Sequence, residues 1–294
     1  MDNDDLDITK GCEISVTISS NISDLKLNPT SHNPQIFHYQ TNQIKIFAGE
    51  GVGVITKKGL KIPPNLPAIN PTPLQAIENI FQKLTKKHQN LKIICTISVK
   101  NGQTIAFKTA NEKVGVIGGI SILGTTGFVK PISNSAYLDS IKTEIEFAKA
   151  NGYDQIVLTL GNSSFIHAKK LYNQSSIVEI GNFIYEAIEI ASNAGFKKAI
   201  FICGIGKLVK VSQGAKNTHN RFGSINFEAL KKYIHEEFNI QIDLDRIKTV
   251  KGVVEYLDSI DLKYPQIFHN KIKNDAIYIF REWNKKINVK IIQI

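Results

Sequence analysis

A glycine-rich stretch, "KVGVIGGISILGTTGFVKP" (113–131), is the first place in this sequence where the chain could hold a ligand. It contains five glycines and the pair Thr125–Thr126. An apolar run at 114–117 predicts a buried strand, and a helical pattern begins at Ser133, a candidate N-cap, so the unit is strand, glycine loop and helix. Such loops hold phosphate, carboxylate or nucleotide-like groups, but glycine also serves tight turns with positive φ. This loop alone leaves both interpretations open.

Three further strand-like segments also end in glycine. They are "YDQIVLTLGN", which reaches Gly161, the shorter "SIVEIGN", and "FKKAIFICGIGKL", which reaches Gly204, and a helical pattern follows each. Repeated strand–helix units predict a parallel sheet with helices on its faces, in which ligands bind beyond the carboxyl ends of the strands. We therefore expect Gly118, Gly161 and Gly204 to meet at one ligand site. The alternative is that glycine merely ends these strands.

Polar residues follow the third of these strand ends. Lys207 comes directly after its glycines and could meet a ligand anion, or it could be one more solvated lysine. The loop "SQGAKNTHNRFGSINFEAL" (212–230) then offers donors, acceptors and one group that titrates near neutrality, in Asn217, Thr218, His219, Asn220 and Arg221. A single histidine in a loop is more often an ordinary surface residue without a function. A binding role therefore requires this loop to reach the sheet edge at which the strands end in glycine.

Composition limits the class of protein. A chain of 294 residues, 42% of them apolar, predicts two domains. A repeated pattern of strand, loop and helix begins at Lys113, which places the domains at 1–112 and 113–294. No apolar run approaches the ~20 residues of a membrane helix, and the start "MDNDDLDITK" is acidic, which predicts a cytoplasmic protein without a membrane partner. Cys12, Cys95 and Cys203 form no CxxC pair, so we expect buried thiols and neither disulfides nor zinc.

The net charge of +10 raises the alternative of nucleic-acid binding. The lysines are scattered and form no long basic run, which makes nucleic acid an unlikely partner, and a basic cleft would attract a polyanionic small molecule equally well. GxSxG, HExxH and P-loop motifs are absent, and the histidines show no ligand spacing. An enzyme with this sequence would work by positioning its reactants.

The first half of the chain predicts a mixture of strands and a helix. Strands are expected at 11–20, 44–47, 53–56 and 91–99. Four prolines between residues 63 and 71 exclude regular structure there. A helix should run from Thr72, as N-cap, to about Lys87.

Several long motifs, in a fixed order, resemble one known family. They are "GEGVGVITKKGL" (49–60), "PAINPTP" (67–73), "GVIGGISILGTTGFVKP" (115–131) and "GFKKAIFICGIGKLVKVSQGAKNTHNR" (195–221). The chain resembles the CbiD family, the cobalt-precorrin-5B C1-methyltransferases of anaerobic cobalamin biosynthesis, from about Asp4 onward and more weakly after about Leu230. The resemblance implies an α+β N-terminal part and an α/β, Rossmann-like C-terminal part with a mostly parallel sheet.

The resemblance also implies a reaction and a set of binding residues. The methyl group of S-adenosylmethionine would pass to C1 of a cobalt-bound corrinoid, which the protein must hold in line with it and shield from water. We assign S-adenosylmethionine to the glycine loops and the rim carboxylates of the corrinoid to basic and amide side chains. His219 could also take a ring proton. The cofactor-binding residues are Gly118, Gly119, Gly124, Thr125, Thr126, Gly127, Gly161 and Gly204, and the substrate-binding residues are Lys207, Asn217, His219 and Arg221, with Lys57 and Asn70 as further candidates.

One departure from the family affects the predicted activity. Members usually begin with a segment like "GYTTGTCAAAAAKAA", which has no counterpart before Asp2. The start could lie upstream, the coding sequence could be split, or the copy could be truncated, and the chain would be inactive alone if that segment lines the active site. An inactive corrinoid-binding scaffold is therefore a second hypothesis. Other corrin-pathway enzymes are possible partners.

Overall fold

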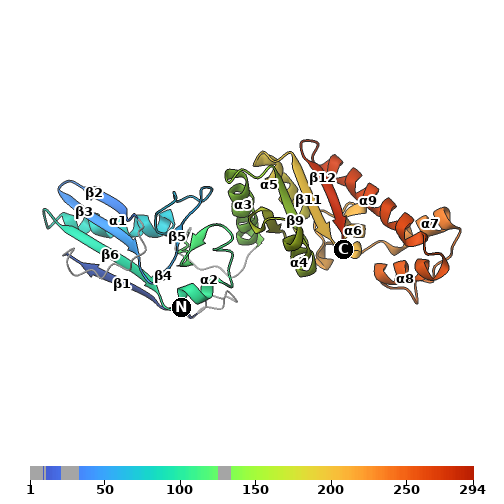
Figure 1. Cartoon of the computed structure of the whole chain (residues 1–294), viewed down its shortest axis with the longest axis horizontal. Coiled ribbons are helices and arrows are strands. Elements are labelled where there is room, and N and C mark those ends of the chain that lie inside the picture. Colours follow the sequence, from blue (N-terminus) through green and yellow to red (C-terminus); the bar gives the residue numbers. More distant parts are fainter. Residues whose placement is uncertain (1–8, 10, 21–32, 125–133) are drawn as a thin grey trace. The chain divides into compact units, whose positions relative to one another are not determined.

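The computed structural model describes residues 9, 11–20, 33–124 and 134–294 of the chain, which forms two compact units, 1–137 and 138–294 (Figure 1). Among the described residues, no helix is both long and apolar enough to cross a membrane. The two units are mixed in character, with helices and strands in each, and a parallel sheet lies in the second.

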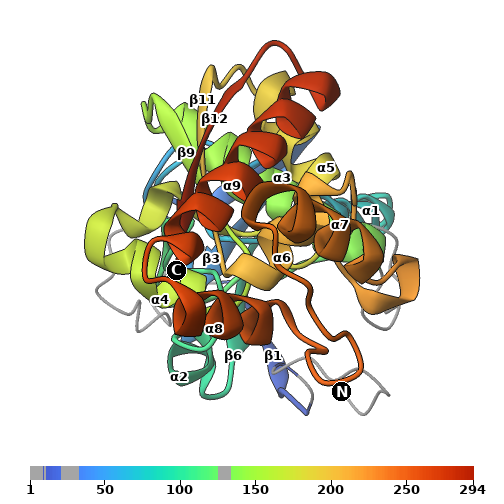
Figure 2. The ribbon, with the colours of Figure 1, turned by 90° about the vertical axis from the view of Figure 1, so that its right-hand side faces the viewer.

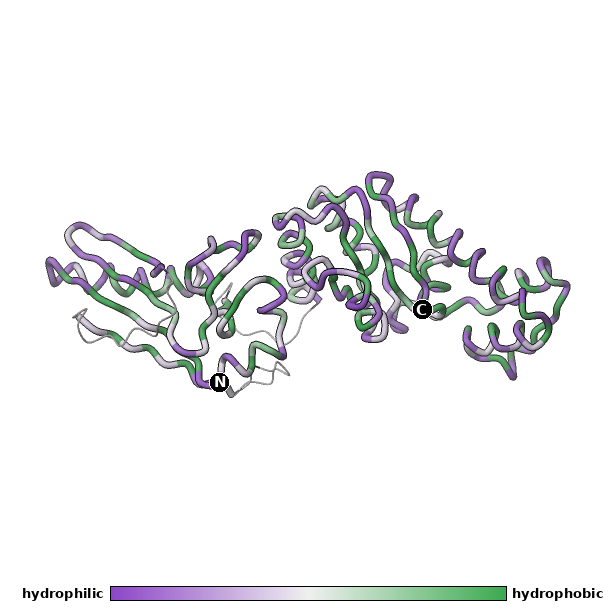
Figure 3. Tube along the Cα trace, viewed as in Figure 1, coloured by the Kyte–Doolittle hydropathy of each residue, from purple (hydrophilic) through white to green (hydrophobic). Residues whose placement is uncertain are grey.

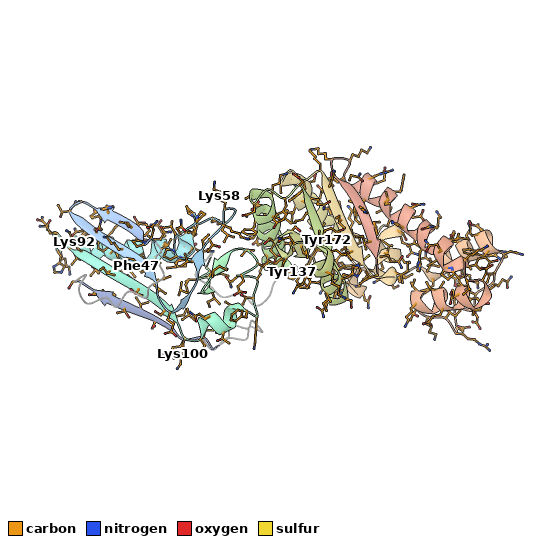
Figure 4. All side chains as sticks on the ribbon, in the orientation of Figure 1. Phe47, Lys58, Lys92, Lys100, Tyr137 and Tyr172 are labelled. Carbon is orange, nitrogen blue, oxygen red and sulfur yellow. The ribbon has the colours of Figure 1, made fainter. Side chains whose placement is uncertain are left out.

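A four-stranded sheet and one long helix dominate the first unit. The sheet order is β1 (Ile14–Ser19), β6 (Lys92–Val99), β3 (Asn42–Ala48) and β2 (Gln35–Tyr39). The β1–β6 and β2–β3 pairs are antiparallel and the β3–β6 pair is parallel. Lys92 and Lys100 lie at the two ends of β6 (Figure 4). The strands predicted at 11–20, 44–47 and 91–99 are therefore confirmed.

Helix α1 (Pro71–Thr85) begins two residues earlier than predicted. Asn70 is its N-cap, so the prediction of Thr72 in that role was wrong. Proline at the first helical position accounts for the start, because its fixed φ suits a helix and its missing N–H would have had no helical partner. Leu74 and Phe81 are buried and give the helix its apolar face.

Two pairs of very short strands complete the first unit. They are β4 (Gly51–Val52) with β8 (Gly119–Ile120), parallel, and β5 (Val54–Ile55) with β7 (Val116–Ile117), antiparallel; the short helix α2 (Gly102–Ala106) packs against β8 and β4. The strand predicted at 114–117 is thus not part of the parallel sheet, where the sequence had placed it. A close backbone contact explains the glycine of β8, because a Cβ on Gly119 would lie 2.2 Å from the carbonyl oxygen of Gly51 in β4.

The second unit is built on a parallel sheet of four strands. Their order is β10 (Ile177–Glu179), β9 (Gln155–Thr159), β11 (Lys198–Cys203) and β12 (Asn288–Gln293). β9 and β11 are apolar along nearly their whole length (Figure 3) and are buried, as expected of strands covered on both faces. The predicted parallel sheet is confirmed, and the finer description as Rossmann-like stays a prediction.

Helices cover both faces of this sheet. On one face α4 (Asn162–Leu171) packs over Val157, Ile200 and Ile202. On the other face the ring of Phe201 meets that of Phe280 at 5.2 Å between centroids, which places α9 (Tyr264–Trp283) there. Figure 2 shows α6 (Ile205–Ser212), α8 (Val250–Ile260) and α9 packed together. The remaining helices are α3 (Asn134–Ala150), α5 (Ile184–Asn193), α7 (Phe227–Phe238) and the 3₁₀ turns Gln174–Ser176 and Asn220–Phe222.

The cysteines lie largely as predicted. Cys95 and Cys203 are buried and Cys12 is half-buried, and all of them are free thiols. Burial raises the pKa of the Cys203 thiol to about 12 and also raises the pKa of Cys95.

Candidate functional site

The carboxyl ends of three adjacent parallel strands form the candidate site. β9 leads to Gly161, β11 leads to Gly204, and β10 leads to Gly181 and Asn182. The sequence predicted that Gly161 and Gly204 share one edge, and the strand order bears this out. Gly118 was wrongly included in this edge, because it lies between β7 and β8 of the first unit, whose pairing partners are β5 and β4.

The glycines at this edge have different reasons for lacking a side chain. Gly161 has φ +91°, a conformation that favours glycine. Gly204 and Gly206, in contrast, have no positive φ. A Cβ added to Gly204 would have the carbonyl oxygen of Ile294 as its nearest neighbour, at 3.9 Å, and a Cβ added to Gly206 would have no neighbour within 4 Å. The fold therefore does not require glycine at the start of α6, where bare backbone N–H groups could meet a ligand closely.

Lys207, in the first turn of α6, reaches across to the end of β10. Its Nζ donates to Oδ1 of Asn182 at 3.2 Å and to the carbonyl oxygen of Thr218 at 3.3 Å. Burial, and secondly the neighbouring charge of Lys210, lower the pKa of Lys207. The ammonium is thus held in place by neutral oxygens.

Lys210 lies one turn later on the same face of α6 and is buried, with 7% of its surface exposed. Its Nζ donates to the carbonyl oxygens of Thr218 (3.0 Å) and Gly223 (3.1 Å) and to Oδ1 of Asn220 (2.8 Å). Within the part of the chain that the structure describes, neither Lys207 nor Lys210 forms an ion pair. Two positive charges without a carboxylate make this edge favourable for an anion.

The polar loop after α6 does reach this edge, as the binding hypothesis requires. Thr218 is fully buried, its N–H donates to the carbonyl oxygen of Asn182 at 3.2 Å, and its hydroxyl donates to Oδ1 of Asn182 at 2.9 Å. Asn217 forms an isolated β-bridge with Phe183. The loop is therefore fixed to the end of β10.

His219 and Arg221 lie exposed on this loop. Nδ1 of His219 accepts a hydrogen bond from the backbone N–H of Arg221 at 3.1 Å, so a neutral ring carries its proton on Nε2 and presents a donor. The Arg221 guanidinium lies 5.1 Å from the ring centre of Phe222, which is 60% exposed. The pair offers a cation and a flat apolar surface.

The other predicted residues fall in the first unit. The backbone N–H of Asn70 donates to the carbonyl oxygen of Ile122 at 3.0 Å, and a Cβ on Gly124 would lie 3.6 Å from Pro73, so Asn70 and Gly124 lie near the start of α1. Lys57 is exposed. The predicted residues thus form two groups, one in each unit. Thr125, Thr126 and Gly127 lie outside the described residues.

Sequence reasoning named Thr218 as one of the polar residues of the loop, and it missed two residues of the site, Asn182 and Lys210. The pair Gly181–Asn182 after β10 repeats the pair Gly161–Asn162 after β9, a signal that was available. The spacing of Lys210 from Lys207 places both on one helix face. Across the described residues, no group of three or more His, Cys, Asp or Glu side chains could hold a metal ion.

Comparison with known proteins identifies similar sequences over most of the chain. Residues 1–131 match the family described as CbiD. A cobalt-precorrin-5B C(1)-methyltransferase of Methanococcus maripaludis strain S2 is 34% identical over 99% of this chain and 77% of its own length, and that of strain C5 is 36% identical over 86% and 67%. The protein of the same name from Methanocaldococcus jannaschii is 36% identical over 78% of this chain and 59% of its own length.

One solved structure is also similar in sequence. It is the cobalamin biosynthesis protein (cbiD) of Archaeoglobus fulgidus, 26% identical, with 79% of this chain and 63% of that chain covered and a TM-score of 0.29.

Proposed function

The chain belongs to the CbiD family of cobalt-precorrin-5B C(1)-methyltransferases, and we propose that it methylates C1 of cobalt-precorrin-5B with S-adenosylmethionine as the methyl donor. The observation that carries the proposal is the 34% identity to a relative of that name over 99% of the chain. The site at the carboxyl edge of the parallel sheet supports it, because bare backbone and uncompensated positive charge lie side by side there.

The glycine-lined edge suits S-adenosylmethionine, which supplies an electrophilic methyl group when bound. We propose that Gly161 and Gly204 contact it, because the backbone at both positions is open to a ligand. Gly118 and Gly124 of the first unit remain candidates together with Thr125, Thr126 and Gly127, and Gly119 is the weakest, because its lack of a side chain already serves the contact with Gly51.

The basic side of the site suits the carboxylates on the rim of a corrinoid. Lys207, Asn217 and Arg221 would bind them as donors, and His219 would donate from Nε2. Lys57 and Asn70 in the first unit are further candidates. Phe222 adds an exposed apolar ring on which a flat macrocycle could rest.

Positioning is the main contribution that these side chains can make. No nucleophilic side chain is needed when the macrocycle provides the attacking carbon, and the protein has to align the two reactants and exclude water. His219 can take up a proton at Nδ1 only if the hydrogen bond from Arg221 is released. We therefore propose a donor role for His219 in binding.

Methyl transfer measured on the whole chain tests the proposal. The protein, cobalt-precorrin-5B and S-adenosylmethionine with a ¹³C-labelled methyl group are incubated anaerobically, and the corrinoid is examined by NMR. A labelled methyl group at C1 supports the proposal. Corrinoid binding without transfer would instead favour the scaffold hypothesis, and steeply salt-dependent binding of generic nucleic acid would favour the nucleic-acid hypothesis.

A further inference from the structure

We propose that Lys207 anchors a carboxylate-binding site at the carboxyl edge of the parallel sheet, with Asn182 and Thr218 orienting its ammonium group and Lys210 keeping the site positive. The proposal rests on the proposed function, since it names the chemical group by which that site recognises a substrate. It also divides two lysines of one helix face into a binding residue and a positioning residue.

One hydrogen bond of Lys207 is weak enough to be exchanged for a ligand. An ammonium group has three N–H donors. Nζ of Lys207 lies 3.2 Å from Oδ1 of Asn182, and its other two contacts, at 3.3 and 3.5 Å, are to the carbonyl and hydroxyl oxygens of one residue, Thr218. The three contacts match the three N–H groups, and the longest, to the Thr218 hydroxyl, lies at the limit of hydrogen-bond distance. A ligand can replace this contact, because the Thr218 hydroxyl keeps its own hydrogen bond to Asn182 and Lys207 is only half-buried.

Lys210 has no donor to offer. Three oxygens of the loop lie 2.8 to 3.1 Å from its Nζ, one for each N–H, and the side chain is buried. A ligand could bind to it only by breaking the loop contacts. Its charge nevertheless acts on Lys207, because it is the second cause, after burial, that lowers the pKa of Lys207. A bound carboxylate would oppose both causes, because it favours the charged form of the ammonium.

The surroundings favour an anion that is small at the point of contact. All partners of Lys207 are neutral oxygens. Gly204 and Gly206 leave the backbone beside it uncovered, and the N–H groups at the start of α6 add partial positive charge. A carboxylate matches the one weakly bonded ammonium N–H together with such backbone groups. It could come from the corrinoid rim or from the methionyl end of the methyl donor.

Two pairs of probes distinguish these sources. The first pair is dicyanocobyrinic acid and its heptamethyl ester, which differ in free carboxylates. The second pair is S-adenosylhomocysteine and 5′-methylthioadenosine, of which only the first has an amino-acid carboxylate. Affinities are measured by calorimetry on the full-length wild type and on Lys207→Met. Lys198→Met is the control, because it removes the same charge from the amino end of β11, at the opposite edge of the sheet.

Lys207→Met should weaken binding of the carboxylate-bearing member of one pair by about tenfold or more and leave its partner unchanged. The pair that responds identifies the source, and Lys198→Met should alter neither pair. Equal affinities of wild type and Lys207→Met for all four probes, or equal losses within both pairs, overturn the proposal. A second variant, Lys207→Gln, whose melting temperature is checked, takes its place if Lys207→Met does not fold. A wild type that binds neither pair contradicts the proposed function itself.

Discussion

Nζ of Lys207 lies 3.2 Å from Oδ1 of Asn182, so the first turn of α6 is tied to the residue pair that follows β10. β10 and β11 are not neighbours, because β9 lies between them. The hydrogen bond therefore crosses the end of β9, where Gly161 leads into α4. Substitution of either partner of this hydrogen bond should reveal whether it stabilises the fold or prepares a site for a ligand.

Asn182→Asp should stabilise the fold and weaken ligand binding. The change keeps the shape of the side chain and pairs Lys207 with a carboxylate, which we expect to raise the free energy of unfolding by about 0.5–1 kcal/mol. The new carboxylate would also compete with that of a ligand. Denaturant unfolding and calorimetry with S-adenosylhomocysteine and dicyanocobyrinic acid measure the two effects.

The matched control is Asn173→Asp, at the amino end of β10, where the side chain accepts from the N–H of Ser175. It makes the same change of charge at the opposite edge of the sheet. Binding that is weakened equally by both variants would point to net charge and contradict a local effect at Lys207.

Gly206→Ala should leave stability nearly unchanged and reduce ligand affinity. A Cβ at this position meets no atom within 4 Å, and alanine is the better helix former, so the free energy of unfolding should be equal or higher by up to about 1 kcal/mol. If a ligand approaches the start of α6, the added methyl group should lower its affinity about tenfold. Unchanged affinity for S-adenosylhomocysteine and dicyanocobyrinic acid would show that no ligand comes close there.

Gly119→Ala should have the opposite consequence and disrupt the first unit. Its Cβ would lie 2.2 Å from the carbonyl oxygen of Gly51, a backbone atom that cannot move aside cheaply. We expect a loss of about 1–3 kcal/mol or more in the free energy of unfolding, as for other overpacked sites. Limited proteolysis should cut residues 33–124 first. Full stability together with lost cofactor binding would instead support the role in binding that the sequence suggested.

Lys210→Met should destabilise the loop from Asn217 to Gly223. The variant removes one ammonium and leaves three oxygens without their donor, which should cost about 1–3 kcal/mol in all. Hydrogen exchange should rise at the N–H of Thr218. Lys232→Met is the control, because that side chain is exposed and its ion pair with Glu236 should contribute no more than about 0.5 kcal/mol.

The strand ends at Gly161 and Gly204 were predictable because their signals are local. Each follows an apolar run long enough to be recognised as a buried strand, and β9 and β11 are indeed neighbours in the sheet. Gly118 was not predictable in this way. β7 has two residues, too few to show the alternation of buried and exposed side chains that identifies a strand. Its partner, β5, lies far earlier in the chain, so the pairing has no local signal.

The missed part of the site depends on tertiary contacts. A lysine on a helix is usually solvated, and nothing within "GKLVKVS" shows that Lys210 is buried under oxygens of a loop that begins after the helix. β12 was also missed, because nothing was predicted for the region after residue 230, where only its pairing with β11 reveals its place in the sheet.

The buried thiol of Cys203 should make the fold less stable at alkaline pH. Burial raises its pKa from 9.0 to about 12 in the folded chain, so between these values the unfolded chain releases a proton that the folded chain keeps. The stabilising effect of the neutral thiol is complete below pH 9 and declines above it by about 1.4 kcal/mol per pH unit. Urea unfolding of wild type and Cys203→Ala at pH 8 and pH 10 isolates this contribution, because every other group is common to both. Parallel losses in the two proteins would show that Cys203 is ionised, or accessible, in the folded state.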